Sequence, residues 1–296
     1  MTYSILARDP ATGELGVAVQ SHAFSVGAIV PWARPGAGAV ATQANAEVAY
    51  GPRALELLVG GAGAAEALGR LVSEDPAAAS RQVAVMDSSG EAAVHTGSSC
   101  IPFAGHVIGE GFSCQANLMA SGEVWPAMAH AFSAASGPLA GRLLDALDAA
   151  EHAGGDVRGR QSAALLVVPR DGEPWETSVS LRVEDDPDPL RELRRLLAMH
   201  DAYDLAGEAD RLAGEGRYDE AARATVRAWE LAPDNHELRF WAGLGMAQGG
   251  MLQAGLEQVR AAISAHPPWR EVLERLPPEV APSAGPVLEA LRAEGG

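Results

Sequence analysis

The first 21 residues predict a strand, a tight turn and a second strand, and this unit limits the folds open to the chain. Residues 3–8 and 15–21 are largely apolar, and the Asp-Pro-Ala-Thr-Gly run at 9–13 has the composition of a tight turn. Strands joined by so short a connection are antiparallel neighbours, because parallel strands need a much longer crossover. The fold is therefore expected to contain an antiparallel sheet that includes the amino-terminal strand.

Apolar runs and turn residues continue to alternate up to residue 183. Further strands are predicted at residues 39–43, 82–86, 92–95, 106–108, 112–116, 163–168 and 177–183. Helices are predicted at residues 53–59, 64–73, 123–134 and 138–152. Strand pairs followed by helices and then strands favour an α+β fold with mostly antiparallel sheets over a doubly wound parallel sheet. Residues 1–183 are interpreted as one such domain.

The pattern changes after a charged, proline-containing boundary at residues 184–189. Residues 184–200 are interpreted as a linker with a helix near 187–199, and residues 201–296 as a small all-α helical-repeat domain. The repeat has a period of 34, which pairs Gly216 with Gly250, Tyr218 with Leu252, Ala221 with Gly255, Ala228 with Ala262, and Pro233 with Pro267. This spacing resembles a tetratricopeptide unit, although an incidental pair of helical hairpins would also produce it.

Two repeats are fewer than such arrays usually contain, so residues 187–199 and 279–293 are expected to cap them. Repeat modules of this kind usually bind other proteins. We expect residues 201–296 to bind a protein partner, to pack on the first domain, or to self-associate in a homo-oligomer.

The composition excludes several classes of function. A net charge of −17 argues against nucleic acid and anionic membrane surfaces, since both require positive patches. All 22 basic residues are arginine, which removes Schiff-base chemistry and the lysine of a phosphate-binding loop. Two cysteines, Cys100 and Cys114, are too few for a disulfide framework or a zinc cage, and are expected to be buried thiols.

The sequence also bears on location and cofactors. No signal peptide and no apolar run of about 18 residues is recognisable, so we expect a cytoplasmic protein without a membrane span. Metal-ligand spacings and a dinucleotide-binding glycine fingerprint are missing from the sequence. We therefore expect neither a metal nor a cofactor.

Thr2 offers the most complete catalytic unit in the chain. Removal of Met1 would leave a hydroxyl and a free α-amine on one residue, at the start of the first strand. A hydroxyl needs a base to become a nucleophile, and an α-amine with a pKa of about 8 can act as that base. Because both groups belong to one residue, they are close without help from another side chain.

Several runs of the sequence resemble the "domain of unknown function 1028" family. They are residues 1–10, 13–19, 30–33, 41–43, 50–53 (Tyr-Gly-Pro-Arg), 95–97 and 155–164, so the resemblance covers about residues 1–200. The family is similar to N-terminal-nucleophile hydrolases, which implies a four-layer α-β-β-α sandwich and supports Thr2 as the nucleophile. It implies no substrate.

The first hairpin also resembles the start of proteasome β-type subunits, which place an aspartate and a lysine near their threonine. This sequence has Gln20 or Ser21 at the comparable position, followed by His22, and it has no lysine. Any network that activates Thr2 must therefore differ, and proteasome-like peptide cleavage is not expected.

Other polar residues are candidates for the same cleft. Asp156 could pair with the positive α-amine, and Ser162 could hydrogen-bond the nucleophile, so both join Thr2 as catalytic candidates. Asp156 could instead hold its own loop through an Asp–Arg pair. The candidates for substrate contacts are Ser21, His22, Gln43, Asn45, Gln115, Asn117 and Arg158. Amides such as Gln43 could stabilise an oxyanion, or could cap a loop or helix.

These residues favour a hydrolase of a small or cyclic amide that uses Thr2 as an N-terminal nucleophile. The alternative is a non-catalytic binding or scaffold protein whose helical repeats recruit a partner. A third hypothesis is a hydrolase that uses Ser4 or Ser21 with His22.

Overall fold

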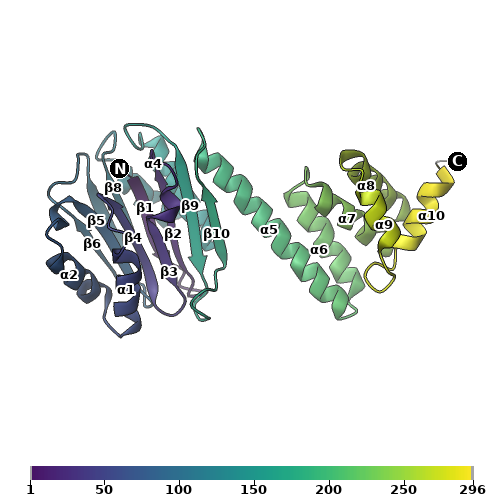
Figure 1. Ribbon diagram of the computed structural model, residues 1–296, viewed down its shortest axis with the longest axis horizontal. Helices are drawn as coiled ribbons and strands as arrows, with labels where there is room; N and C mark the ends of the chain where they lie inside the picture. The colour runs from purple at the N-terminus through teal and green to yellow at the C-terminus, as the bar shows by residue number, and fades with distance from the viewer. Residues whose placement is uncertain (1, 295–296) are drawn as a thin grey trace. The chain divides into compact units, whose positions relative to one another are not determined.

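A computed structural model describes residues 2–294 of the protein (Figure 1). The chain forms two compact units, which divide between Arg195 and Leu196. The first unit combines two antiparallel β-sheets with helices, and the second is helical. The expectation of mixed α and β structure followed by a helical region is therefore confirmed.

The larger sheet has six strands in the order β10-β9-β2-β1-β8-β7. Their bounds are β1 (Thr2–Arg8), β2 (Leu15–Ser21), β7 (Gly105–Gly109), β8 (Phe112–Asn117), β9 (Ser162–Val168) and β10 (Val179–Val183). The predicted first hairpin is confirmed: Asp9 accepts hydrogen bonds from the backbone of Ala11 and Thr12, and Gly13 has φ 79°. That left-handed conformation favours glycine, so the sequence at residues 9–13 determines the turn.

The smaller sheet has four strands in the order β3-β4-β5-β6. They are β3 (Pro31–Arg34), β4 (Gly38–Ala44), β5 (Arg81–Asp87) and β6 (Ala92–Thr96). Strand β3 was not predicted from the sequence. This strand has only four residues, begins with proline and lies at the sheet edge, where its residues are only partly buried. It therefore lacks the long apolar alternation by which the other strands were recognised.

Apolar side chains from both sheets form one core. Leu6 and Val17 of the six-stranded sheet pack with Ala84 and Met86 of the four-stranded sheet. Since strand side chains alternate between faces, the next residues along each strand face the helices instead. Helices α1 (Tyr50–Val59) and α2 (Ala64–Glu74) pack on the four-stranded sheet, and α3 (Val124–Ala134) and α4 (Leu139–His152) on the six-stranded one.

The helices from residue 189 onward are α5 (Pro189–Gly214), α6 (Tyr218–Leu231), α7 (His236–Gln248), α8 (Leu252–Ala265), α9 (Trp269–Arg275) and α10 (Ala284–Glu294). Helix α5 is one continuous helix of 26 residues rather than the shorter helix expected near 187–199. It begins at proline, which suits a first helical position, and no proline follows within it to end it early.

Two observations bear on the predicted repeat. Helices α6 and α8 each have 14 residues, start 34 residues apart and follow left-handed glycines, Gly216 and Gly250. In addition, α7 and α8 cross closely: a Cβ atom on Gly255 would lie 2.4 Å from the carbonyl oxygen of Gly243. Small residues therefore allow these two helices to approach each other closely.

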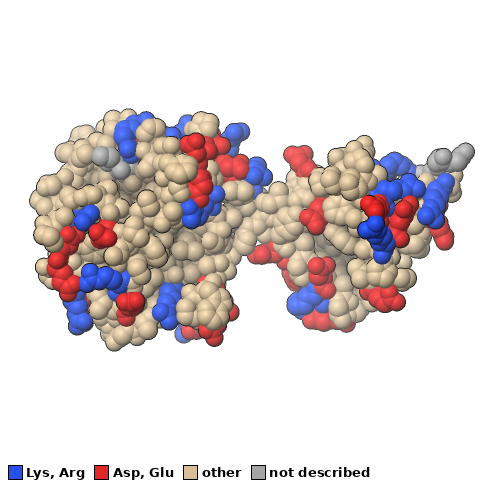
Figure 2. All heavy atoms as spheres, viewed as in Figure 1, with Lys and Arg blue, Asp and Glu red and all other residues tan. Residues whose placement is uncertain are grey.

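Charged side chains of both signs are interspersed on the surface. On the face drawn in Figure 2, arginines lie beside aspartates and glutamates rather than in one continuous basic area. Some pairs are partly buried, such as Arg81 with Asp75 at 2.8 Å. None of the helices in residues 2–294 is both long and apolar enough to cross a membrane.

Candidate functional site

Thr2 lies in a row of polar side chains at one end of the six-stranded sheet. It pairs with Ser21 of β2 on one side and Asn117 of β8 on the other, and Ser21 pairs in turn with Ser162 of β9. Directly opposed residues point to the same face of an antiparallel sheet. The Thr2 hydroxyl accordingly donates a hydrogen bond to Ser21 Oγ at 3.1 Å. All four residues are buried.

Amide side chains form hydrogen bonds with the backbone of Thr2. Gln43 Nε2, from the opposite sheet, donates to the Thr2 carbonyl oxygen at 3.3 Å, and Asn117 Nδ2 donates to it at 3.4 Å. Both amides also donate to Gln82 Oε1, at 2.7 and 2.9 Å. Gln82 thus anchors the two amide side chains that contact the Thr2 carbonyl and fixes the start of β1 against the second sheet.

Ser4 and Gln115 extend this network along the sheet. The Ser4 hydroxyl donates to Gln43 Oε1 at 2.6 Å and accepts from Gln115 Nε2 at 2.6 Å. Both residues are fully buried. Buried polar groups are usually hydrogen-bonded, and a connected set of them rigidifies its surroundings. The contacts of Ser4 are with amides, and they suit a role in joining the sheets.

Gln82 is not among the site residues predicted from the sequence. The residue alternates onto the same face as Ala84 and Met86, which point into the core between the sheets. A glutamine at an inward position of a buried strand needs buried partners. That pattern could have marked Gln82, but only the sheet packing shows which amides it meets.

Asp156 lies in line with β1, beyond its amino-terminal end. It forms a bridge with Met119, two residues past Asn117, and its Oδ2 accepts from the backbone N–H of His22, one residue past Ser21. Asn117 and Ser21 are the two residues that pair with Thr2. The segments that follow them run past the start of β1, and Asp156 lies between these two segments. The Asp156 carboxylate is fully buried.

Arg158 forms a two-point ion pair with Asp156. Its Nη2 lies 2.7 Å from Oδ2, and its Nε donates to Oδ1 at 3.0 Å. The Arg158 side chain remains 33% exposed. The pair holds the loop before β9, which is the structural role considered for these residues, and it keeps a buried carboxylate compensated.

The remaining predicted site residues lie farther from this network or have other contacts. Ser162 donates to the Ala23 carbonyl at 2.5 Å and accepts from the backbone of Val26 at 3.0 Å, so it secures the loop after β2. His22 Nδ1 lies 3.2 Å from the carbonyl oxygen of Arg160. Asn45 donates to Ser80 Oγ at 3.1 Å on the surface, outside the buried network.

Tyr3 fixes the start of β1 from the opposite face of the sheet. Its hydroxyl donates to Glu151 Oε1 of α4 at 2.5 Å. Burial, together with the Glu151 charge, raises the pKa of the Tyr3 phenol well above its ordinary value. Contacts on both faces of β1 therefore restrain the backbone that carries Thr2.

Other potential reactive groups in the described chain give no second site of this kind. Burial raises the pKa of the Cys114 and Cys100 thiols, which favours the unreactive protonated form. Among residues 2–294, no three His, Cys, Asp or Glu side chains are grouped so that they could hold a metal ion.

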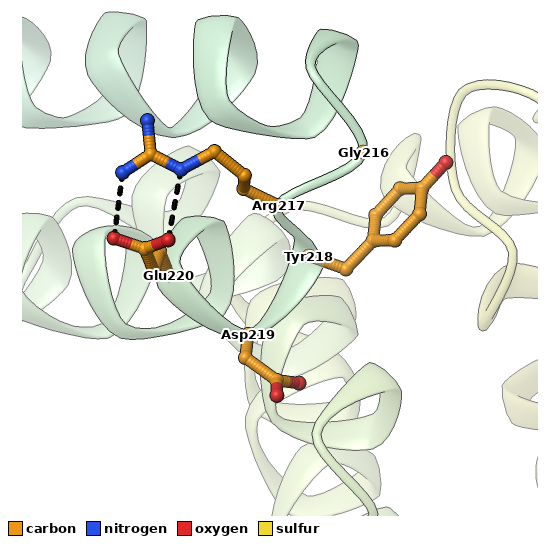
Figure 3. A pocket seen from close by; sticks show the side chains of 5 residues that line it. All are labelled: Gly216, Arg217, Tyr218, Asp219 and Glu220. Atoms are coloured by element: carbon orange, nitrogen blue, oxygen red, sulfur yellow. Dashed lines mark hydrogen bonds and ion pairs between the residues drawn. The ribbon is translucent and has the colours of Figure 1, made fainter.

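A hollow in the helical unit is lined by five consecutive residues, Gly216 to Glu220 (Figure 3). Arg217 donates two hydrogen bonds to the Glu220 carboxylate, from Nε at 2.8 Å and from Nη2 at 2.7 Å. The Tyr218 side chain points away from this pair. The Arg217 and Glu220 charges are thus paired within a single turn, and no side chain from a distant segment lines the hollow. The row at Thr2 remains the candidate functional site.

Comparison with known proteins places this geometry in a family. Residues 2–193 match the model of a family of unknown function (DUF1028). The chain belongs to this family. It is also similar to the crystal structure of protein SPO2555 from Silicibacter pomeroyi, itself assigned to DUF1028, with 36% identity and a TM-score of 0.62. That match covers 66% of this chain and 84% of the other. No curated protein matches this chain.

Proposed function

We propose that the protein hydrolyses amide bonds with Thr2 as an N-terminal nucleophile once Met1 has been removed. The observation that supports this most directly is the place of Thr2, at the first position of a central strand with its carbonyl held by Gln43 and Asn117. A catalytic group must be held close to its productive geometry, and rigid elements achieve this better than loops.

In the proposed reaction, Thr2 Oγ attacks the substrate carbonyl while the α-amine of Thr2 takes the hydroxyl proton. The C–N bond then breaks, and the proton passes to the leaving amine. Water attacks the resulting ester in the second step and releases the acid, with the same α-amine as base. Ser21 Oγ, 3.1 Å from Thr2 Oγ1, would orient the hydroxyl during both steps.

The flanking groups suit this chemistry. Asp156 lies in line with β1, where its carboxylate would stabilise the protonated α-amine between the two proton transfers. Asn117, beside Thr2 in the row, would have to exchange its Nδ2 hydrogen bond to the Thr2 carbonyl for one to a developing oxyanion, since its other donor is bonded to Gln82. The scarcity of aromatic residues, 5% of the chain, favours a small or cyclic amide.

The layer order supports the same proposal. The packing of α1 and α2 on one sheet, of the two sheets on each other, and of α3 and α4 on the other sheet supports a four-layer α-β-β-α sandwich like that of N-terminal-nucleophile hydrolases. The equal lengths and 34-residue offset of α6 and α8 support a tetratricopeptide-like second unit. We propose that this unit binds a protein partner or a second copy of the chain.

The proposal is tested by measuring release of ammonia or amine from a panel of small amides. Wild type is compared with Thr2→Ala, which deletes the hydroxyl, and with Thr2→Ser, which keeps it. Thr12→Ala, in the turn at the other end of the same hairpin, is the matched control. We expect turnover by wild type, Thr2→Ser and Thr12→Ala but not by Thr2→Ala. Equal turnover by Thr2→Ala and wild type would remove Thr2 from the chemistry.

A further inference from the structure

Four large apolar side chains are exposed on loops at the end of the sheet where Thr2 lies. They are Phe24 at 68% exposed, Ile101 at 44%, Phe103 at 52% and Val157 at 58%. Scattered exposed apolar residues are normal on a protein surface, whereas a group of them around one site needs an explanation. We call these four residues the apolar rim.

Backbone hydrogen bonds place three rim residues on neighbouring segments. The amides of Leu118 and Met119, just past β8, donate to the carbonyls of Ile101 at 2.9 Å and Phe103 at 3.1 Å. The amide of Val157 donates to Leu118 at 3.3 Å. All of these segments therefore lie just beyond Asn117, the β8 partner of Thr2.

Phe24 lies on the other side of the row. It follows β2 by three residues, and the carbonyl of its neighbour Ala23 accepts a hydrogen bond from Ser162 at 2.5 Å. Ser162 itself belongs to the row at Thr2. The apolar rim thus flanks the row from β8 on one side to β2 on the other.

The exposed phenylalanines of the chain all belong to the apolar rim. The chain has five phenylalanines, and two of them, Phe24 and Phe103, belong to the apolar rim. The other three are Phe112, Phe132 and Phe240, and each is at most 7% exposed. A chain with so few aromatic rings therefore exposes two of its largest apolar side chains at one end of one sheet.

We infer that the apolar rim binds a hydrocarbon group on the acyl side of the amide whose carbonyl Thr2 attacks. This rests on the proposed function. The acyl part is the part that stays bonded to Thr2 after the amine has left, so groups around Thr2 contact it in both steps. The substrate class is an amide of a carboxylic acid that has an alkyl or aryl group.

The test uses two β-lactones, one with a methyl and one with a hexyl substituent, on the full-length protein. Thr2 Oγ adds to the lactone carbonyl, the ring C–O bond breaks, and the hydroxyl proton passes through the α-amine to the released alkoxide. The adduct has the mass of the protein plus the whole lactone. The second-order rate constant is taken from the adduct at Thr2, located by peptide mapping, plus any hydroxy acid that water releases.

The expected preference follows from the five additional methylenes of the hexyl lactone. Each methylene that leaves water strengthens binding about fourfold. Burial of only two of them against the rim therefore predicts that wild type reacts at least about tenfold faster with the hexyl lactone. In the double variant Phe24→Ser with Val157→Ser, the ratio of the hexyl-lactone rate constant to the methyl-lactone rate constant should fall to about threefold or less.

Trp175→Ser is the matched control. Trp175 is 76% exposed and lies on the β9–β10 connection. That connection follows Val168, which pairs with Leu15 at the opposite end of the sheet from Thr2. This variant should keep the wild-type ratio.

Each outcome separates the inference from the proposed function. Reaction of Thr2 with both lactones at equal rates would overturn the inference and leave the hydrolase proposal standing. Failure of both lactones to acylate Thr2 would contradict the proposed function itself. Equal rates in a wild-type dimer that dissociates in the double variant would assign the rim to a second copy of the chain and would also overturn the inference.

Discussion

Gln82→Leu should strongly destabilise the first unit, because Gln82 links the two sheets by hydrogen bonds next to the residues that contact Thr2. Its amide makes five hydrogen bonds, at distances from 2.7 to 3.2 Å. Leucine has a similar volume but can make none of them. The amide nitrogens of Gln43 and Asn117 would keep only contacts of 3.3 Å or longer.

The magnitude follows from these five bonds. An intramolecular hydrogen bond contributes about 1 kcal/mol, and a buried group left without a partner costs about 1–3 kcal/mol. Burial of the leucine side chain offsets part of the loss. We therefore expect a decrease of about 3–5 kcal/mol in the free energy of unfolding, a large fraction of the roughly 5–15 kcal/mol typical of a folded domain.

The assay is thiol labelling of Cys114. This thiol is fully buried in β8, and both cysteines of the chain lie in the first unit, so labelling reports on that unit alone. With a reagent that reacts slowly compared with reclosing of the sheet, the labelling rate measures the population of the open form. Peptide mass analysis locates the label at Cys114. A loss of about 3 kcal/mol predicts labelling at least about 100-fold faster in Gln82→Leu.

Ser113→Ala is the matched control on the same strand as Cys114. The Ser113 hydroxyl is buried without a hydrogen-bond partner, so its removal should leave stability unchanged or raise it slightly. If Gln82→Leu labelled within about fivefold of wild type, the amide network would not be holding the sheets together, and the argument for a fixed Thr2 would fail.

Three further predictions test separate parts of the account. Asp156→Asn should shift the pH midpoint of Thr2 acylation by the methyl lactone to lower pH by about one unit or more, since loss of the carboxylate lowers the pKa of the α-amine; an unmoved midpoint would exclude this role. Since folding raises the pKa of Tyr3, the stability that the neutral phenol provides is complete below pH 10.0 and is lost as pH rises through the raised value. Denaturant melts should therefore show a smaller alkaline loss for Tyr3→Phe than for wild type, and equal losses would refute the assignment. In the helical unit, Gly243→Ala would place a Cβ atom 2.8 Å from the Gly255 carbonyl oxygen and should lower the free energy of unfolding of that unit by about 1–3 kcal/mol. Gly285→Ala, in open space, should leave it unchanged or raise it. Amide hydrogen exchange measures both changes.

Much of the fold could be predicted from local patterns. The first hairpin was recognisable because its apolar strands flank a turn whose residues determine its backbone, including the left-handed Gly13. Strand β3 was not, since four partly buried residues at an edge have no distinctive alternation. The length of α5 was underestimated because a domain boundary was expected at residue 200 and the helix was ended at 199, whereas the helix continues to Gly214.

The candidate site was harder to predict because it depends on strand register. Thr2, Ser21 and Asn117 could each be chosen as polar residues at strand ends, but only the pairing of β1 with β2 and β8 brings them into one row. The place of Asp156 depends on a single bridge to Met119 between segments with no strand pattern. Gln82 was missed because its contacts depend on the pairing of β5 with β4, which brings Gln43 to it, and on the packing of the opposite sheet, which brings Asn117 to it.

The measurement that tests the central claim most directly is the amino-terminal sequence of the purified protein, checked by intact mass. The account predicts that the mature chain starts at Thr2, with a free α-amine available as the base. Quantitative retention of Met1 would contradict it, because the amine of Thr2 would then lie within a peptide bond and could not accept the proton.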